Sequence, residues 1–488
     1  MSLMTRRNFI KVGTAASVLA SGTLAKSIAR VNGANDRIRI GIAGVRSKGA
    51  HHIELFGALP QIEIAALCDP DQDILEREKK KLQANGSQVM GFADVRSMLD
   101  MKNLDAVVIA TPNHWHSLMA IWACQAGKDV YVEKPISHNI WEGRKLVQVA
   151  RKYKRIVQTG TQSRSDEALH QAFAYVNEGN LGPIKLVKGL CYKRRKSIGK
   201  VPGPQPVPGS IDYNLWAGPA PMVPLRRSRL HYDWHWQWAT GNGDIGNQGV
   251  HEMDMCRWAI GQDQLPDHVV SLGGRFGYLD DGETPNTQVT FYDYKPVPVI
   301  FEVRGLPSRK DQNFMDSFKG IRIGIVIECE DGYFAGGAGG GWMYDKKGAK
   351  IKQFSSEGGS THHINFISAM QSRKVSSLNA DVLEGHLSSA LCHLGNISYR
   401  LGRTLDPSEL QEMIKNYSGM QETFHGFKDH LFSNWVDLSS QQPVLGPCLE
   451  VDTEQERFVE KENYDPQYWA NQLVKEEYRS PFLVPNNV

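Results

Sequence analysis

The chain has 488 residues, 41% hydrophobic and 22% charged, so it is long enough for two or three domains with their own cores. This composition excludes an intrinsically disordered chain, and a formal net charge of +3 indicates neither nucleic acid nor an anionic membrane as a partner. Its 7 cysteines include no CxxC pair, which argues against a zinc ribbon or a thioredoxin-type site.

The first 35 residues have the features of an export signal. The segment TRRNFIK, residues 5–11, matches the twin-arginine signature, and an apolar, small-residue stretch at 12–25 is too short to span a bilayer. We therefore predict a twin-arginine signal peptide at 1–35 and a periplasmic or otherwise exported protein, with a basic amphipathic helix as the alternative. No later segment is apolar enough to predict a membrane span in the mature chain.

Strand and helix patterns alternate from Arg37 onward. Short apolar runs predict buried strands at 38–43, 63–67, 105–110 and 129–132, with helical patterns between them at 51–59, 73–84 and 117–126. This alternation predicts βαβ units around a parallel sheet. Residues 37–160 are therefore expected to form a Rossmann dinucleotide-binding domain.

After Gly160 the strands alternate in polarity, which favours an antiparallel sheet with one covered face. The expected strands are 183–192, 269–276, 288–292, 297–304 and 323–330, and the expected helices are 363–371 and 385–401. The predicted fold is α/β, with an α+β domain carrying a large, mostly antiparallel open sheet at 161–405. Residues 406–488 form a C-terminal extension of short helices and loops.

The first strand leads into GIAGVRSKG, residues 41–49, which resembles a GxGxxG fingerprint. Gly44 and Gly49 take its first and third places, while Arg46 replaces the second glycine. The helix that follows still offers its N-terminal amides to a pyrophosphate, and Arg46, Ser47 and Lys48 can add side-chain contacts.

Asp69 ends the second strand, 20 residues beyond Gly49. An acid at this distance binds the adenosine ribose and repels a 2′-phosphate, which favours NAD, although Arg46 and Lys48 leave NADP open. Asp69 can also serve as the N-cap of the next helix.

Further motifs follow in order: TPNHWH at 111–116, EKP at 133–135, GTQSR at 160–164, LWAGPAP at 215–221 and HHINF at 362–366. This set resembles the Gfo/Idh/MocA oxidoreductases over most of residues 38–403. The resemblance implies an NAD(P)-dependent enzyme acting on a secondary hydroxyl of a sugar, glycoside or polyol. It also implies a homodimer or homotetramer built on the open sheet.

The resemblance also implies roles for single residues. The residues expected to contact the cofactor here are Thr111, Asn113, His116, Glu133, Lys134 and Gln162. Lys134 is expected to contact both the nicotinamide and the reacting hydroxyl, aimed by a cis peptide before Pro135.

The segment GNGDIGNQGVHEMD, residues 241–254, resembles the family pattern GGGxLxDxGxHxxD. His251 matches the catalytic histidine, whereas Asn247 replaces the usual aspartate. Asparagine cannot take a proton but can hold a hydroxyl, so we expect Lys134, His251 and Asn247 to be catalytic. Asp244 is a candidate substitute for the missing aspartate.

Aromatic residues are concentrated in HYDWHWQW, residues 231–238, where flat rings can stack on a sugar. The expected substrate residues are Arg164, Tyr232, Trp234, His235, Asp244 and His251. An aromatic core segment is the alternative. His231, Asp233, His235 and His251 also have the chemistry of metal ligands and are a further alternative, but no metal is expected.

Free NAD is scarce outside the cytoplasm, so the cofactor is expected to stay bound and to be recycled by a second sugar. Two other functions remain open. One is an NAD-dependent glycosidase that oxidises its substrate transiently at C3 and eliminates the aglycone, and the other is a non-catalytic binding protein.

Overall fold

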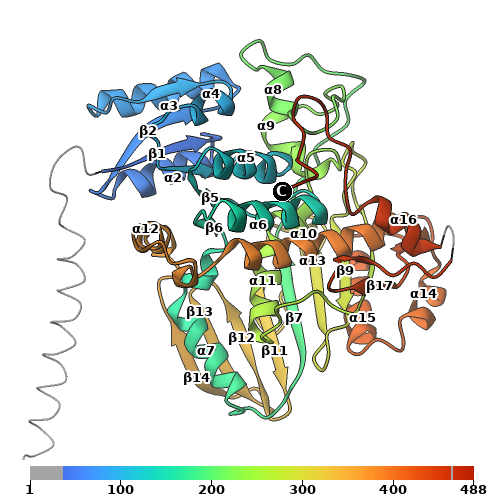
Figure 1. Cartoon of the computed structure of the whole chain (residues 1–488). Helices are drawn as coiled ribbons and strands as arrows, with labels where there is room; N and C mark the ends of the chain where they lie inside the picture. Colours follow the sequence, from blue (N-terminus) through green and yellow to red (C-terminus); the bar gives the residue numbers. More distant parts are fainter. Residues whose placement is uncertain (1–36, 463–464) are drawn as a thin grey trace, which may run out of the picture.

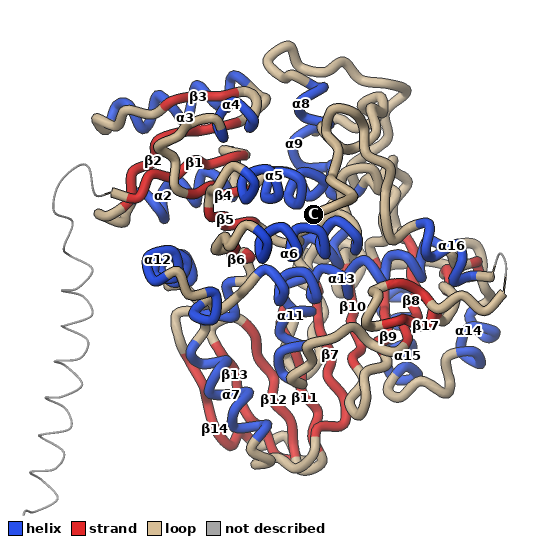
Figure 2. Tube along the Cα trace, in the orientation of Figure 1, coloured by secondary structure: helices blue, strands red, loops and turns tan. Residues whose placement is uncertain are grey.

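The computed structural model describes residues 37–462 and 465–488, so the predicted signal peptide at 1–35 lies outside the described residues. Two sheets organise the described chain, with helices between and around them (Figures 1 and 2). No helix among the described residues is long and apolar enough to cross a membrane.

The first sheet has six parallel strands in the order β3-β2-β1-β4-β5-β6, the doubly wound arrangement that the sequence predicted. Its strands are β1 (Ile38–Ala43), β2 (Ile62–Cys68), β3 (Met90–Phe92), β4 (Ala106–Ile109), β5 (Asp129–Val132) and β6 (Val157–Thr159). Its helices are α2 (Lys48–Gly57), α3 (Gln72–Ala84), α4 (Val95–Leu99), α5 (Asn113–Gln125) and α6 (Ile140–Lys152). The apolar runs at β1 and β4 are almost wholly buried because helices cover both faces of the sheet.

The second sheet is mixed but mostly antiparallel and follows the order β14-β13-β12-β11-β7-β10-β9-β8-β16-β15. Only β10 and β7 pair in parallel along this path among the described residues. Its strands are β7 (Ile184–Tyr192), β8 (His268–Gly274), β9 (Thr287–Tyr292), β10 (Val299–Arg304), β11 (Ile323–Cys329), β12 (Gly332–Gly337), β13 (Gly340–Asp345), β14 (Lys350–Ser355), β15 (Arg403–Thr404) and β16 (Val444–Leu445). Two short strands, β17 (Leu449–Asp452) and β18 (Arg457–Phe458), pair beside it. The predicted fold class is confirmed.

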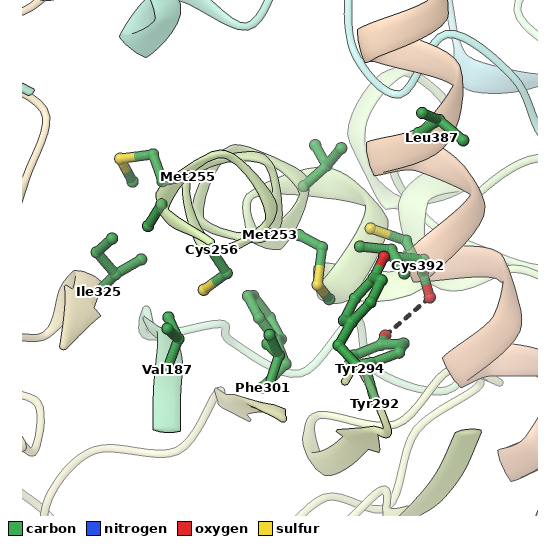
Figure 3. Close-up of a cluster of buried hydrophobic side chains, with 14 of the residues drawn as sticks. Val187, Met253, Met255, Cys256, Tyr292, Tyr294, Phe301, Ile325, Leu387 and Cys392 are labelled. Atoms are coloured by element: carbon green, nitrogen blue, oxygen red, sulfur yellow. Dashed lines mark hydrogen bonds between the residues drawn. The ribbon is translucent and has the colours of Figure 1, made fainter. Parts of the chain in front are cut away.

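The inner face of this sheet packs against α7 (Glu167–Asn177), α11 (Gly249–Ala259) and α13 (Val382–Arg400). Figure 3 shows α11 beside α13 over the strands of the sheet, with Phe301 and Met253 in the core beneath α11. The hydroxyl of Tyr292 donates to the carbonyl oxygen of Leu391 at 2.8 Å, which joins sheet and α13. The helix that carries His251 therefore rests on a rigid base.

The outer face of the sheet is covered by the C-terminal extension. Apolar side chains of β8, β9 and β10 pack against α14 (Pro407–Met413) and α15 (Met420–Ser433), with Phe424 and Phe427 fully buried there. The sequence did not predict this cover. A homo-oligomer therefore stays a prediction, and this part of the sheet is not free to form its interface.

Segments from beyond the predicted boundary at residue 160 pack into the Rossmann domain. Helix α12 (His362–Ser372) packs into the core of the Rossmann sheet through Phe366 and Met370. The last residues, after α16 (Pro466–Gln472), return to that domain, where Phe482 and Val484 are buried. The Rossmann domain is thus completed by segments from far along the chain.

Candidate active site

One pocket lies between the carboxyl edge of the Rossmann sheet and the second part of the chain. The loops after β1, β2, β4 and β5 form one side, and α9 (Leu230–Asp233), its neighbours and α10 (Gly243–Asn247) form the other. The cavity has a volume of about 270 Å³ and opens to solvent. The predicted residues that line it are Gly44, Arg46, Ser47, Asp69, Thr111, Asn113, His116, Glu133, Lys134, Tyr232, Trp234, His235 and Asn247.

The loop after β1 retains glycine where the backbone requires it. Gly44 has φ of +77°, and a Cβ there would lie 2.7 Å from the carbonyl oxygen of Ala110. A Cβ on Gly49 would lie 1.7 Å from the carbonyl oxygen of Gly44. The start of α2 can therefore pack this closely against the turn only because residue 49 is glycine. Arg46 is exposed, and Ser47 has φ of +47° without a described side-chain cap bond to α2. The N–H of Gly49 donates to the carbonyl oxygen of Arg46 at 2.9 Å, and no side chain caps the start of α2, which suits an anionic ligand there.

Asp69 is held by backbone amides at the pocket. Its carboxylate accepts the N–H groups of Val45 and Asp71, each at 3.0 Å, and burial raises the pKa of the Asp69 carboxyl. The N-cap of α3 is Asp71, whose side chain accepts the N–H of Asp73 at 3.2 Å. The additional capping role considered for Asp69 is therefore wrong.

The turn after β4 has one side chain available to a ligand. Thr111 lines the pocket, and its buried Oγ1 has no hydrogen-bond partner within the described part of the chain. His116 fixes this turn because its ring nitrogens lie 2.6 Å from the carbonyl oxygen of Pro135 and 2.8 Å from that of Thr111. Asn113 donates to Asn242 at 3.0 Å and so joins the two sides of the pocket.

Glu133 and Lys134 follow β5 and have opposite surroundings. Burial alone would raise the pKa of Glu133, but a hydrogen bond with His52 at 2.9 Å and the charge of Lys48 hold it well below its usual range. The ammonium of Lys134 donates to the carbonyl oxygen of Asn247 at 2.6 Å. Burial lowers the pKa of Lys134, although the charge of Glu133 opposes this. The Lys134–Pro135 peptide is cis, which confirms that prediction.

His251 lies near Lys134 on α11 but is not among the residues that line the pocket. Burial, with the charge of Lys134, lowers the pKa of His251 to about 3, so its imidazole is neutral near pH 7. Asn247 acts through its backbone carbonyl, which receives Lys134, while its side-chain amide lies 3.5 Å from Asp244. The geometry thus places a neutral base and an ammonium close together.

Besides Gly49 and His251, three predicted site residues lie outside the pocket lining, each with a partner of its own. Asp244 is bound by Arg195 through contacts of 2.8 and 2.6 Å, so it is not available as the substitute base. Arg164 forms a buried pair with Asp254, its Nε lying 2.9 Å from one carboxylate oxygen, so a free substrate-binding guanidinium is not found. Gln162 hydrogen-bonds Tyr131 instead of facing the pocket. Sequence spacing gave no sign of these partners.

The aromatic segment contributes one wall of the pocket. The rings of Trp234 and His235 stack with centroids 3.6 Å apart and planes at 20°, and burial lowers the pKa of His235 to about 3. The Tyr232 hydroxyl accepts from Arg195 at 2.9 Å, while Trp236 is buried in the structure. Tyr232, Trp234 and His235 therefore line the pocket, whereas Trp236 belongs to the protein core.

The alternative metal ligands do not come together. His231 lies 2.7 Å from Asp71, and Asp233 is paired with Arg229 at 2.7 Å. No group of three or more His, Cys, Asp and Glu side chains suited to a metal occurs among residues 37–462 and 465–488.

Two residues of the site were not predicted, although Trp115 lies within the TPNHWH motif at 111–116. Trp115 lines the pocket, and its indole N–H lies 3.1 Å from the carbonyl oxygens of Leu215 and Trp216. His52 lies in the predicted helix at 51–59, where the helical pattern gives no sign that it is the partner of Glu133.

Comparison with known proteins agrees with this architecture. Residues 38–161 match the Gfo/Idh/MocA model described as an oxidoreductase family with an NAD-binding Rossmann fold. Residues 177–286 match the model of that family's C-terminal α/β domain. These two domains and the relatives below support assignment to the Gfo/Idh/MocA oxidoreductase family.

Among the relatives is a levoglucosan dehydrogenase of Pseudarthrobacter phenanthrenivorans, 24% identical over 52% of this chain and 62% of the relative. A glycosyl hydrolase family 109 protein of Shewanella baltica is 30% identical over 30% of this chain and 36% of the relative. The rhizopine catabolism protein MocA of Rhizobium meliloti is 27% identical over 52% of this chain and 67% of the relative. The first two matches therefore span less than two thirds of those relatives.

Solved structures share the fold at lower identity. The WlbA dehydrogenase of Bordetella pertussis, in complex with NADH and UDP-GlcNAcA, has a TM-score of 0.55 and 20% identity, covering 75% of this chain and 97% of that one. An NAD-binding protein of Listeria innocua has a TM-score of 0.51 and 18% identity, covering 73% of this chain and 93% of that one. These likenesses concern the fold alone.

Proposed function

We propose that this Gfo/Idh/MocA-family oxidoreductase uses NAD to oxidise or reduce a secondary hydroxyl of a sugar, glycoside or polyol. The observation that carries the proposal is the contact of Lys134 with the Asn247 carbonyl. It places an ammonium where the Rossmann loops meet the aromatic wall. A neutral His251 lies near that ammonium.

The residues of the pocket fit a dinucleotide. The uncapped start of α2 suits a pyrophosphate, and the unpartnered Oγ1 of Thr111 suits a polar group of the cofactor. Asp69 lines the same pocket and suits an adenosine ribose, which favours NAD over NADP. Trp216 and Tyr232 line the same pocket. That the cofactor stays tightly bound is part of the proposal, because free NAD is scarce outside the cytoplasm.

NAD, when bound, supplies the two-electron oxidant or reductant. In the oxidative direction neutral His251 accepts the proton of the substrate hydroxyl, and the ammonium of Lys134 stabilises the negative charge that develops on its oxygen. Asn247 orients Lys134 through its carbonyl oxygen. Trp234 and Tyr232 supply aromatic surface for the C–H faces of a sugar.

The first experiment identifies the nucleotide and then the reaction. The purified protein is denatured, released nucleotide is identified by mass spectrometry, and change in NADH absorbance is followed with a panel of sugars and glycosides. Lys134→Met is expected to keep bound nucleotide and lose turnover by about 10²–10⁴-fold. A protein that neither contains nor binds NAD or NADP would support the non-catalytic alternative. Near-normal turnover by Lys134→Met would refute the role of Lys134.

A second function uses the same groups for glycoside cleavage by transient oxidation at C3. The matches to glycosyl hydrolase family 109 proteins favour keeping it as a candidate. The two functions differ in net reaction, because a dehydrogenase accumulates a keto-sugar whereas the glycosidase releases free sugar with no net change in NADH. Chromatography of a glycoside reaction mixture distinguishes them.

Export by the twin-arginine route is part of the proposal, on the evidence of TRRNFIK at residues 5–11. A fusion of residues 1–35 to a reporter should be exported. Replacing Arg6 and Arg7 with lysine should retain the reporter in the cytoplasm, and export of that variant would contradict the assignment.

A further inference from the structure

Lys193 lies directly after β7, beside the proposed catalytic groups. Its ammonium donates to the side-chain oxygen of Gln248 at 2.7 Å. The amide nitrogen of Gln248 in turn donates to the carboxyl of Glu252 at 3.1 Å. These two hydrogen bonds hold the side-chain oxygen of Gln248 toward Lys193. The Lys193 ammonium is therefore oriented by a neutral amide.

Lys193 is not neutralised by a carboxylate. It forms no ion pair among residues 37–462 and 465–488. Glu252 is 2% exposed, and burial raises the pKa of its carboxyl to about 8, so it carries little charge at neutral pH. Asp244 is occupied by Arg195, and Glu133 by His52 and Lys48.

Lys134 likewise forms no ion pair within 37–462 and 465–488, and its described hydrogen bond is to a carbonyl oxygen. Glu133, whose charge acts on it, is already paired with His52 and Lys48. The charge of Lys193 also contributes to the lowered pKa of Lys134. Lys134 lines the pocket, and Lys193 lies beside it through Gln248, the neighbour of Asn247. A ligand that brings a negative charge would offset the repulsion between the two ammonium groups.

We propose that the substrate is an acidic sugar whose carboxylate binds Lys193 while a ring hydroxyl binds Lys134. A pyranose ring holds a carboxylate and a hydroxyl on one rigid frame, so a single ligand offers both groups. This inference rests on the proposed function and adds the substrate class. A sulfate ester offers the same charge from another source, and the experiment below separates the two.

The test compares methyl glucuronide, methyl glucoside and glucose 6-sulfate on the NAD-loaded full chain. Binding is measured by isothermal titration calorimetry and turnover by NADH absorbance. The uronide is expected to bind at least about tenfold more tightly than the neutral glycoside, and this ratio should fall with added salt. Lys193→Met should bring the ratio close to one, whereas Lys193→Arg should restore part of it. The exposed Lys196 lies in the same basic run, and Lys196→Met serves as the matched control with an unchanged ratio.

Equal binding of uronide and glucoside, or an unchanged ratio in Lys193→Met, would overturn the inference. Failure of all three ligands to bind would also count against it. If the sulfate ester binds more tightly than the uronide, the group that Lys193 recognises is a sulfate and not a carboxylate. Because NAD binding is measured first on the same protein, a failed preference with intact NAD binding leaves the proposed function standing, whereas absent NAD binding removes both.

Discussion

Phe482 packs edge-on against Trp115, with ring centroids 5.4 Å apart and planes at 78°. Trp115 lines the pocket, and its indole N–H bonds the opposite wall at Leu215. The C-terminal segment therefore supports the pocket from behind, which gives a structural role to the end of the chain.

Phe482→Ala should lower the melting temperature and weaken NAD binding, because it leaves a cavity behind Trp115. Loss of a buried phenylalanine costs about 3–5 kcal/mol. Differential scanning fluorimetry with and without NAD measures both effects. Phe432 is 81% exposed, so Phe432→Ala is the matched control and should change stability by less than about 0.5 kcal/mol. Equal behaviour of the two variants would contradict the supporting role.

The Trp115–Phe482 contact also shows what sequence reasoning reached and what it did not. Gly44, Gly49 and Lys134 were predictable because local motifs fix turns and strand ends along short stretches of chain. The partners of Arg164 and Asp244 were not, because Asp254 and Arg195 approach them only in the tertiary structure. The packing of α14 and α15 on the outer face of the sheet was not predictable for the same reason. An amphipathic pattern shows that a helix has an apolar face but not which surface that face covers.

The pH dependence of turnover should lack an acid limb near the usual histidine pKa. Burial and Lys134 lower the pKa of His251 to about 3, so the neutral base is present from pH 5 upward. Activity should fall at the alkaline side, at a pH below the usual lysine value, because the pKa of Lys134 is lowered and its charge is needed. Steady-state kcat/KM from pH 5 to 10 tests this. An acid limb near pH 6.5 that disappears in His251→Asn would show that His251 titrates normally.

The buried carboxyl of Glu252 should make stability fall with rising pH. Its pKa is raised from 4.5 to about 8 by burial, so the folded state binds the proton more tightly than the unfolded state. The stabilisation is full below about pH 4.5 and is lost as the pH rises through about 8. Glu252→Gln removes this loss and should raise the melting temperature at pH 8.5 by about 2–4 °C relative to the wild type. At pH 5 the two proteins should melt alike, and a gain of equal size at both pH values would contradict the linkage.

Asp69 should control the choice between NAD and NADP. Asp69→Asn keeps an oxygen that can accept from Val45 or Asp71 but removes the charge that would repel a 2′-phosphate. The ratio of kcat/KM for NADP to that for NAD should rise by at least about tenfold, the change expected when about 1.4 kcal/mol of discrimination is lost. Asp94 lines the same pocket but is paired with Arg96 at 2.6 Å, so Asp94→Asn is the matched control and should leave the ratio within about twofold. If Asp69→Asn and Asp94→Asn alter cofactor choice equally, the preference comes from the general charge of the pocket and not from a contact at Asp69.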